Sequence, residues 1–335
     1  MFTNNFHFNT EKQLNENYDR DILPFWETHA QSGNFIGVDN KRIHTVNIRT
    51  GNNKAIVICQ GRNESALKYK ELAFDLHRQG YDLFFIDHRG QGLSQRLGGD
   101  KHRAHIKRFQ DYVSDLNTYV ESLTLTTQYQ HTFLLSHSMG ATISTLYLEQ
   151  YTHPFNACIV LSPMFSINLG MPISLAKLIT RTYSILDHWF LKHPCYIFHG
   201  QGYHTKQFEK NQLTSSELRF KISNSIFIDH PETQLGSPTM HWVSESINAT
   251  HQAIKNANKI NVPVLSIQAG ADTIVSNIGQ EHFFANLPQS NNNEFMVIAS
   301  AKHEILIEQD EYRIPALNKV LEFIHRIQNN ESNNL

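Results

Sequence analysis

A serine at position 138 carries the clearest chemical signal in this sequence. Residues 131–142 read HTFLLSHSMGAT, an apolar run that stops at Ser138 among small residues and turns into a helical pattern. A strand, a tight turn and a helix in this order match the G-x-S-x-G nucleophile elbow, which exposes the serine oxygen in a strained turn. Ser136 replaces the first glycine, whereas Gly140 keeps the second. We therefore predict Ser138 as a nucleophile; a buried strand with an incidental serine is the alternative.

A serine hydroxyl becomes a good nucleophile only when a base removes its proton, and a carboxylate must orient a histidine base. The strand-like run VPVLSIQAG leads into Asp272, and NEFMVIAS leads into His303. Serine, acid and histidine then follow in a known triad order, each at the end of a strand. The chain has 20 histidines, so only its place after the last strand selects His303.

Two backbone N–H groups must also face the oxyanion that forms when the serine attacks a carbonyl. Met139, the residue after the nucleophile, is predicted to supply one. The other is predicted at Arg62, because the strand-like run KAIVICQG ends at Gly61 and a helical pattern follows shortly after. The alternative is a plain turn at Gln60 and Gly61 with an arginine that faces solvent.

Four other residues near these motifs could do chemistry. Glu304 is an alternative triad acid, but a residue adjacent to His303 cannot easily fold back to its ring. His137 is expected to pack beneath the elbow, because an elbow exposes only its central side chain. Asp87 and Arg89 lie at a strand end before two glycines, so we interpret both as structural residues of a turn.

Composition sets limits on the function. The 335 residues are 40% hydrophobic with a net charge of −2, which gives no electrostatic reason to expect nucleic acid. The opening segment is polar, so a secretory signal is not expected, and no apolar run approaches the roughly 20 residues of a membrane span. Cys59 and Cys158 lie in apolar runs and are expected to be reduced core residues of a cytoplasmic protein. Pairs such as His102 and His105 lack further ligands, so neither metal nor organic cofactor is expected.

Strand and helix patterns alternate along most of the chain. This alternation predicts an α/β fold with a mostly parallel sheet and helices on both faces. It breaks between residues 166 and 260, where one apolar helical stripe precedes a polar stretch. We predict a catalytic core from 1–165 and 261–335, with 166–260 as an inserted cap.

Several motifs together resemble the α/β-hydrolase branch that contains monoacylglycerol lipases and bacterial inner-membrane lysophospholipases of the L-two type. The matching segments are GVDN, ICQGRNES, KYKELAFDL, FFIDHRGQGLSQR, RFQDYVSDL, SHSMGATISTLYL, SPMF with GMP, GSPTMHWVSESI and HEILIEQD. They span nearly the whole chain. The resemblance implies an α/β-hydrolase fold, hydrolysis of lysophospholipids or other single-acyl glycerolipids, and catalysis by Ser138, Asp272 and His303. Ser136 and Gln60 depart from the usual residues, but both leave the backbone donors in place.

Two other functions remain as alternatives, of which the acyltransferase would use the same acyl-enzyme and the non-catalytic homologue is disfavoured by the intact Ser138, Asp272 and His303. An acyltransferase would pass the acyl group to a lipid alcohol, and a non-catalytic homologue would only bind lipid. A lipid substrate also implies peripheral contact with the inner face of the cytoplasmic membrane, because no span is expected. The cap contains the apolar residues predicted to touch lipid, which are Leu175, Leu178, Ile179, Trp189, Phe190 and Leu191. The alternative is that these residues pack the cap onto the catalytic domain.

Overall fold

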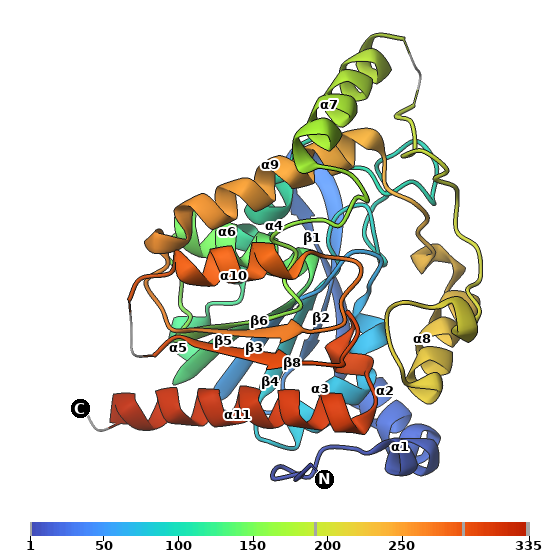
Figure 1. Cartoon of the computed structure of the whole chain (residues 1–335). Helices are drawn as coiled ribbons and strands as arrows, with labels where there is room; N and C mark the ends of the chain where they lie inside the picture. Colours follow the sequence, from blue (N-terminus) through green and yellow to red (C-terminus); the bar gives the residue numbers. More distant parts are fainter. Residues whose placement is uncertain (1, 191–192, 290–291, 333–335) are drawn as a thin grey trace.

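The fold is built around one sheet of eight strands at the centre of Figure 1. This computed structural model describes residues 2–190, 193–289 and 292–332, without the side chains of residues 184, 186–190, 331 and 332. The strands are β1 (Ala30–Gly37), β2 (Lys41–Ile48), β3 (Lys54–Cys59), β4 (Asp82–Ile86), β5 (His131–His137), β6 (Ala157–Leu161), β7 (Val264–Ala269) and β8 (Glu294–Ile298). The α-helices are α1 (Glu11–Asn17), α2 (Leu23–His29), α3 (Lys70–His77), α4 (Gln110–Ser122), α5 (Leu125–Gln128), α6 (Met139–Gln150), α7 (Ile173–Phe190), α8 (Glu217–Asp229), α9 (Met240–Asn256), α10 (Asn277–Ala285) and α11 (Asp310–Ser332).

The strands lie in the order β1-β2-β4-β3-β5-β6-β7-β8. Strand β2 is antiparallel to both of its neighbours, and every pair from β4 to β8 is parallel. The carboxyl ends of the parallel strands therefore share one edge of the sheet, which is where such folds bind ligands. The loops after β3, β5, β7 and β8 meet at this edge.

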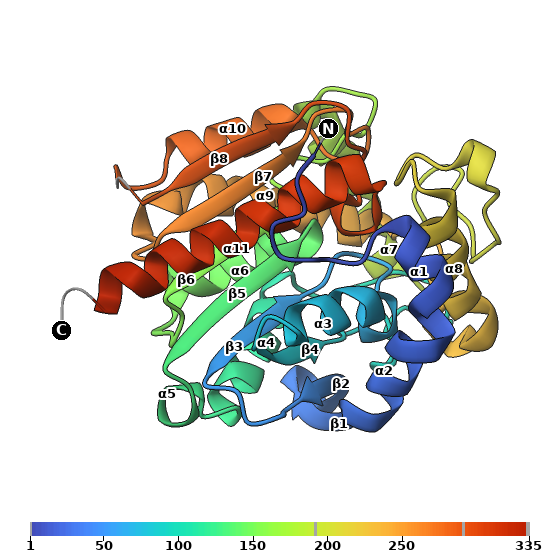
Figure 2. The same ribbon diagram turned by 90° about the horizontal axis from the view of Figure 1, so that it is seen from below.

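Alternate side chains of the strands enter two separate cores. Val57 and Leu134 belong to the core under α4, α6 and α9. Ile58 and Leu135, their neighbours in sequence, belong to the core under α3 and α11. Figure 2 shows α11 and α3 lying across the second face. The sheet is thus buried on both faces, which explains its continuous apolar runs.

The predicted α/β fold class is confirmed. The helical pattern expected after Ser138 is helix α6, which begins at Met139. Helices α1, α2, α5, α8, α9 and α10 lie where the sequence patterns predicted none. In α8 the buried face includes Arg219 beside Phe220 and Ile226, so apolar periodicity could not reveal that helix.

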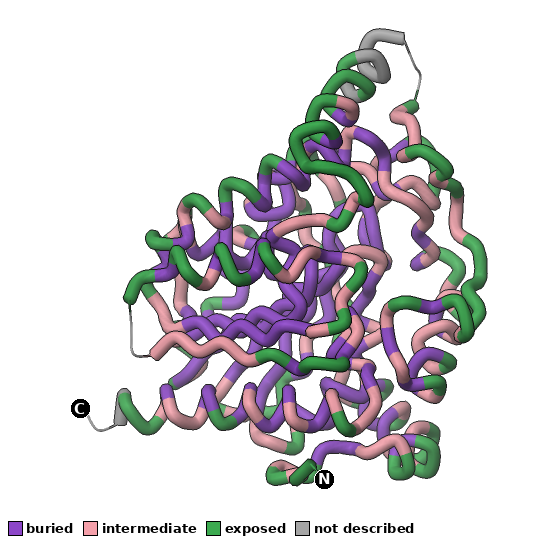
Figure 3. Tube along the Cα trace, viewed as in Figure 1, coloured by how far each residue is buried: buried purple, intermediate pink, exposed green. Residues whose placement is uncertain are grey.

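The interval 166–260, predicted to be a cap, contains three α-helices. Helix α7 stands away from the sheet and α8 lies at the side of the molecule (Figure 1). Helix α9 instead packs along α6 and contributes Trp242 and Ile247 to a core of the sheet. In Figure 3 most of the described part of α7 is exposed, in contrast to α9.

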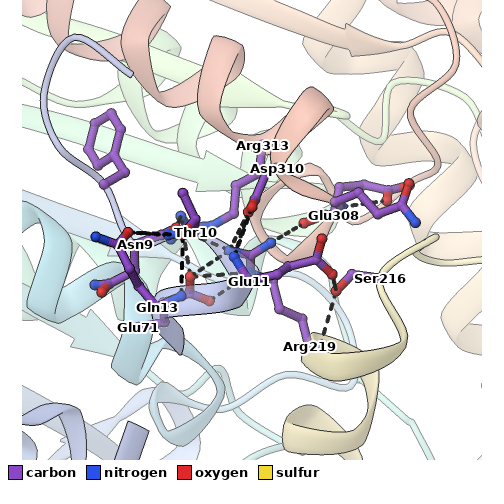
Figure 4. Close-up of polar contacts among 12 residues, drawn as sticks. Asn9, Thr10, Glu11, Gln13, Glu71, Ser216, Arg219, Glu308, Asp310 and Arg313 are labelled. Atoms are coloured by element: carbon purple, nitrogen blue, oxygen red, sulfur yellow. Dashed lines mark hydrogen bonds and ion pairs between the residues drawn. The ribbon is translucent and has the colours of Figure 1, made fainter. Parts of the chain in front are cut away.

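Buried charges tie the N-terminal segment to α8 and to the C-terminal helix (Figure 4). The carbonyl oxygen of Asn9 accepts hydrogen bonds from Arg219 of α8 at 3.2 Å and from Arg313 of α11 at 3.3 Å. Glu71 lies 2.9 Å from Arg219 and 3.3 Å from Arg313. Asp310 completes the group at 3.0 Å from Arg219. These contacts join segments that are far apart in sequence.

Candidate active site

Ser138 lies between β5 and α6 in a strained backbone conformation, with φ 51° and ψ −117°. The turn depends on Gly140, because a Cβ there would lie 2.1 Å from the carbonyl oxygen of Cys59 on β3. Ser136, which occupies the first glycine position, is fully buried and donates its hydroxyl to the carbonyl of Ile159 at 3.1 Å. A serine fits here because the neighbouring strand satisfies its hydroxyl.

The structure brings Ser138, Asp272 and His303 together from three separate loops. The Ser138 hydroxyl lies 2.8 Å from Nε2 of His303, and Nδ1 of His303 lies 2.6 Å from Oδ2 of Asp272. The other oxygen of Asp272 accepts the N–H groups of Ile274 and Val275 at 2.8 and 3.1 Å. A carboxylate fixed in this way directs the Nδ1 proton toward itself, so Nε2 can accept the serine proton.

The loop after β3 lies beside the elbow. Its Gly61 N–H donates to the carboxylate of Glu64, and its Asn63 N–H donates to Gln91 at 3.3 Å. The N–H of Arg62, between them, donates to no acceptor within the described residues. Met139 opens α6, where an N–H has no acceptor inside the helix. These two residues are the ones predicted to hold an oxyanion.

Asp87 and Arg89, which follow β4, make contacts that fit their structural interpretation. Asp87 accepts the N–H groups of Ala66 and Leu93 at 2.8 and 2.9 Å, and thereby joins the loops after β3 and β4. Arg89 donates from two nitrogens to Asp115 of α4 at 2.6 Å. Both side chains are buried and engaged with other parts of the fold.

A group of buried charges beside the triad was missed by the sequence analysis. Lys68 lies 2.8 Å from Glu64 and 2.7 Å from Glu304. Glu64 also lies 3.1 Å from Nδ1 of His137, which is buried beneath the elbow as expected. Glu304 therefore faces Lys68, whereas the His303 ring is paired with Asp272. These four residues come from three separate segments of the sequence, so their grouping can be recognised only once the fold is known.

Neither a metal site nor a membrane span is found in the described part of the chain. No three or more His, Cys, Asp or Glu residues gather there in an arrangement that could hold an ion. No described helix combines the length and apolar character that crossing a bilayer requires. Cys59 and Cys158 are buried and form no disulfide.

Comparisons with known proteins identify the family of the chain. Residues 50–310 match the family described as serine aminopeptidase, S33. The chain is 35% identical over 315 residues to lysophospholipase L2 of Escherichia coli K12, covering 91% of this chain and 90% of that protein. It is 36% identical over 308 residues to the probable lysophospholipase L2 of Haemophilus influenzae, covering 91% and 95%.

One solved structure shows how far the fold is shared. A soluble variant of monoglyceride lipase from Saccharomyces cerevisiae, in complex with a substrate analogue, superposes with a TM-score of 0.69 at 18% identity, covering 89% of this chain and 94% of that one. At this identity the likeness supports the fold alone.

Proposed function

The chain belongs to the serine aminopeptidase S33 family of α/β-hydrolases, and we propose that it is a lysophospholipase that also hydrolyses monoacylglycerols. One observation carries the proposal: hydrogen bonds run from Asp272 through His303 to Ser138 in a chain that aligns with lysophospholipase L2 over 91% of its length. An arrangement of this kind activates a hydroxyl for attack on an ester.

The proposed reaction has two steps. His303 takes the proton of Ser138 as the hydroxyl oxygen attacks the ester carbonyl, and Asp272 stabilises the imidazolium that forms. The tetrahedral intermediate then expels the glycerol oxygen, which takes the proton from His303. Water, activated by the same histidine, attacks the acyl-serine and releases the fatty acid. Every step uses side chains or backbone of this chain, so the proposal includes neither metal nor organic cofactor.

The proposed oxyanion hole consists of the N–H groups of Arg62 and Met139. Support comes from the hydrogen bonds of the surrounding loop, since both neighbours of Arg62 have acceptors for their own N–H groups. Donors that are free before the reaction can bind the oxyanion without first breaking another bond. Removing one donor of this kind typically costs about 10² to 10³ in kcat.

We also propose peripheral contact with the inner face of the cytoplasmic membrane, made by α7 within the cap. Leu175 and Leu178 of this helix expose 47% and 65% of their surface, and Ile185 exposes 51%. Apolar side chains that enter the bilayer interface favour binding. Ile179 is half-buried. The side chains of Trp189 and Phe190, and all of Leu191, lie outside the described residues.

Product analysis tests the function directly. The purified protein is incubated with a lysophospholipid, a monoacylglycerol and a diacyl phospholipid, and the products are identified by mass spectrometry. We expect free fatty acid from the two single-acyl lipids, and little from the diacyl lipid. Ser138→Ala is the control, and should lower kcat by about 10⁴ to 10⁶ while the fold is kept.

Two results would contradict the proposal. Transfer of the acyl chain to a lipid alcohol, with little free fatty acid, would indicate an acyltransferase. Lipid binding without turnover, together with no labelling of Ser138 by a fluorophosphonate, would indicate a non-catalytic homologue.

A further inference from the structure

His137 bonds to two acceptors at once. Its Nδ1 lies 3.1 Å from the carboxylate of Glu64, and its Nε2 lies 3.2 Å from the carbonyl oxygen of His303. A carboxylate and a carbonyl oxygen both accept, so each contact needs a proton on the ring nitrogen. A neutral histidine carries only one such proton. Both contacts form together only when His137 is an imidazolium.

Glu64 connects this histidine to the loop after β3, which is called the oxyanion loop below because it contains Arg62. Its Oε2 accepts the N–H of Gly61 at 2.5 Å and the hydroxyl of Tyr69 at 2.5 Å. The fit is close, because a Cβ on Gly61 would lie 2.9 Å from both Glu64 Oε2 and His137 Nδ1. Gly61 immediately precedes Arg62, whose N–H is a proposed oxyanion donor. A continuous set of contacts thus runs from that loop to the backbone of the triad histidine.

The charges of the group balance only if His137 is protonated. Lys68 bridges Glu64 and Glu304, and its side chain is 9% exposed. Two carboxylates and one ammonium would leave a net negative charge in a buried place, which is costly. An imidazolium at His137 brings the group to two positive and two negative charges. The triad ring also faces it, with its centroid 5.0 Å from that of His137.

We propose that His137 is a positioning residue that is protonated at pH 7. With Glu64 it fixes the position of the oxyanion loop relative to the loop of His303. The role rests on the proposed serine-hydrolase chemistry of the site. It differs from the triad roles because His137 touches neither Ser138 Oγ nor the reacting ester. It acts by fixing the backbone on both sides of the substrate carbonyl.

The pKa values of the group support this assignment. Burial lowers the pKa of His137, but the Glu64 carboxylate outweighs burial and the net pKa is raised. Burial raises the pKa of Glu64, yet Lys68 and His137 hold it well below its usual value. A small cavity beside this group is also lined by Tyr69 and Glu71. Burial and Glu64 raise the pKa of Tyr69 well above its usual value, and Glu71 is paired with Arg219.

The first test reads the protonation state without any turnover. The protein is labelled with ¹⁵N-histidine, and the ring signals of His137 are identified by their loss in His137→Gln. We expect two protonated ring nitrogens at pH 7 in the unmodified protein. In Glu64→Gln we expect one bare nitrogen, because burial and Lys68 then both oppose the charge. A bare ring nitrogen on His137 in the unmodified protein at pH 7 overturns the proposal.

The second test uses the pH dependence of kcat/KM on a soluble short-chain ester. His137→Gln leaves the group with a net negative charge near the His303 ring, which stabilises the His303 imidazolium. The apparent pKa of the acid limb of the pH profile should then rise by about half a pH unit to one pH unit. kcat/KM at pH 7 should fall about 10- to 100-fold, because the oxyanion loop and the loop of His303 are no longer held in the correct relative position.

The double variant Glu64→Gln with His137→Gln restores a balanced charge. Its acid limb should return toward that of the unmodified protein, although kcat/KM stays low. His44→Gln is a matched control, since His44 is also buried against a carboxylate, at 3.1 Å from Asp87, but does not contact the His303 loop. His44→Gln should leave the apparent pKa of the acid limb unchanged.

An unmoved limb in His137→Gln, or no return in the double variant, contradicts the proposal. Failure of the proposed function is distinguishable, because it would remove ester turnover from the unmodified protein while the ring signals of His137 stayed as expected.

Discussion

A Cβ on Gly140 would lie 2.1 Å from the carbonyl oxygen of Cys59. The start of α6 and the end of β3 are therefore too close together for any side chain at position 140. The carbonyl oxygen of Gln60 would lie 2.5 Å from the same Cβ. Both neighbours are backbone atoms, which cannot rotate away. The nucleophile and the proposed oxyanion donors thus share one contact that admits only glycine.

Gly140→Ala is therefore expected to separate Met139 from the loop of Arg62. A shift of about 1 Å in this geometry can cost about 100-fold in rate. We expect kcat/KM on a short-chain ester to fall at least that far, with a lower free energy of unfolding. Gly33→Ala on the edge strand β1 is the control, since its Cβ would lie 3.3 Å from the Thr45 hydroxyl. Similar activity losses in both variants would argue against a specific role for the contact.

Asp272 and Glu304 were both possible acids from the sequence, and their contacts now predict different effects. Asp272→Asn should lower kcat by about 10⁴, because an amide no longer favours the required tautomer of His303. Glu304→Gln removes a partner of Lys68, which lies 2.7 Å away, and should cost about 10-fold or less. Steady-state kinetics on one soluble ester compares the two. If the larger loss occurred in Glu304→Gln, the acid would have to be reassigned.

The three residues of the proposed triad could be selected from sequence because each follows a recognisable apolar strand. Ser138, Asp272 and His303 are each marked by a strand end, and parallel strands bring such ends together. The group around Glu64 has no such mark. Its members lie in the segment after β3, at the end of β5 and after β8, and their pairing depends on side-chain directions that no local pattern encodes. His137 was correctly expected to be buried, but its two acceptors could not be seen.

Helix α8 illustrates the same limit in the fold. Its buried face carries Arg219, whose charge is matched by Glu71 and Asp310 from distant parts of the chain. An analysis of hydrophobic periodicity predicts that such an arginine lies on the exposed face of a helix. The N-terminal segment shows the reverse case, because a polar sequence includes Phe8 and Asn9, which are 1% and 2% exposed.

Arg219→Met should destabilise the protein strongly. The substitution leaves the buried Glu71 with Arg313 as its remaining partner and removes an ion pair from the half-buried Asp310. Loss of one member of a buried pair typically costs about 3 to 5 kcal/mol. The free energy of unfolding in urea measures this effect. Lys221→Met on the same helix is the matched control, because Lys221 pairs with Glu217 while 69% exposed. An exposed pair is worth about 0.5 kcal/mol or less. Equal losses would mean that the cluster adds nothing beyond surface pairing.

The membrane contact proposed for α7 predicts a selective loss on lipid surfaces. Leu178 and Ile185 expose 65% and 51% of their surface, and each side chain that enters the interface can contribute up to about 2 kcal/mol. Leu178→Ser with Ile185→Ser should therefore reduce sedimentation with liposomes, and reduce activity on a vesicle-embedded lysophospholipid. Turnover of a soluble short-chain ester should stay nearly unchanged.

Ile228→Ser is the matched control for this prediction, because Ile228 is 63% exposed but lies on α8. It removes the same kind of apolar surface from another helix of the predicted cap, so it should leave liposome binding in place. The net charge of −2 offers little attraction to anionic lipid, and binding should depend only weakly on salt. If the α7 variant lost activity equally on vesicles and on the soluble ester, the exposed side chains would serve the packing or movement of the cap, and the membrane would have to be contacted elsewhere.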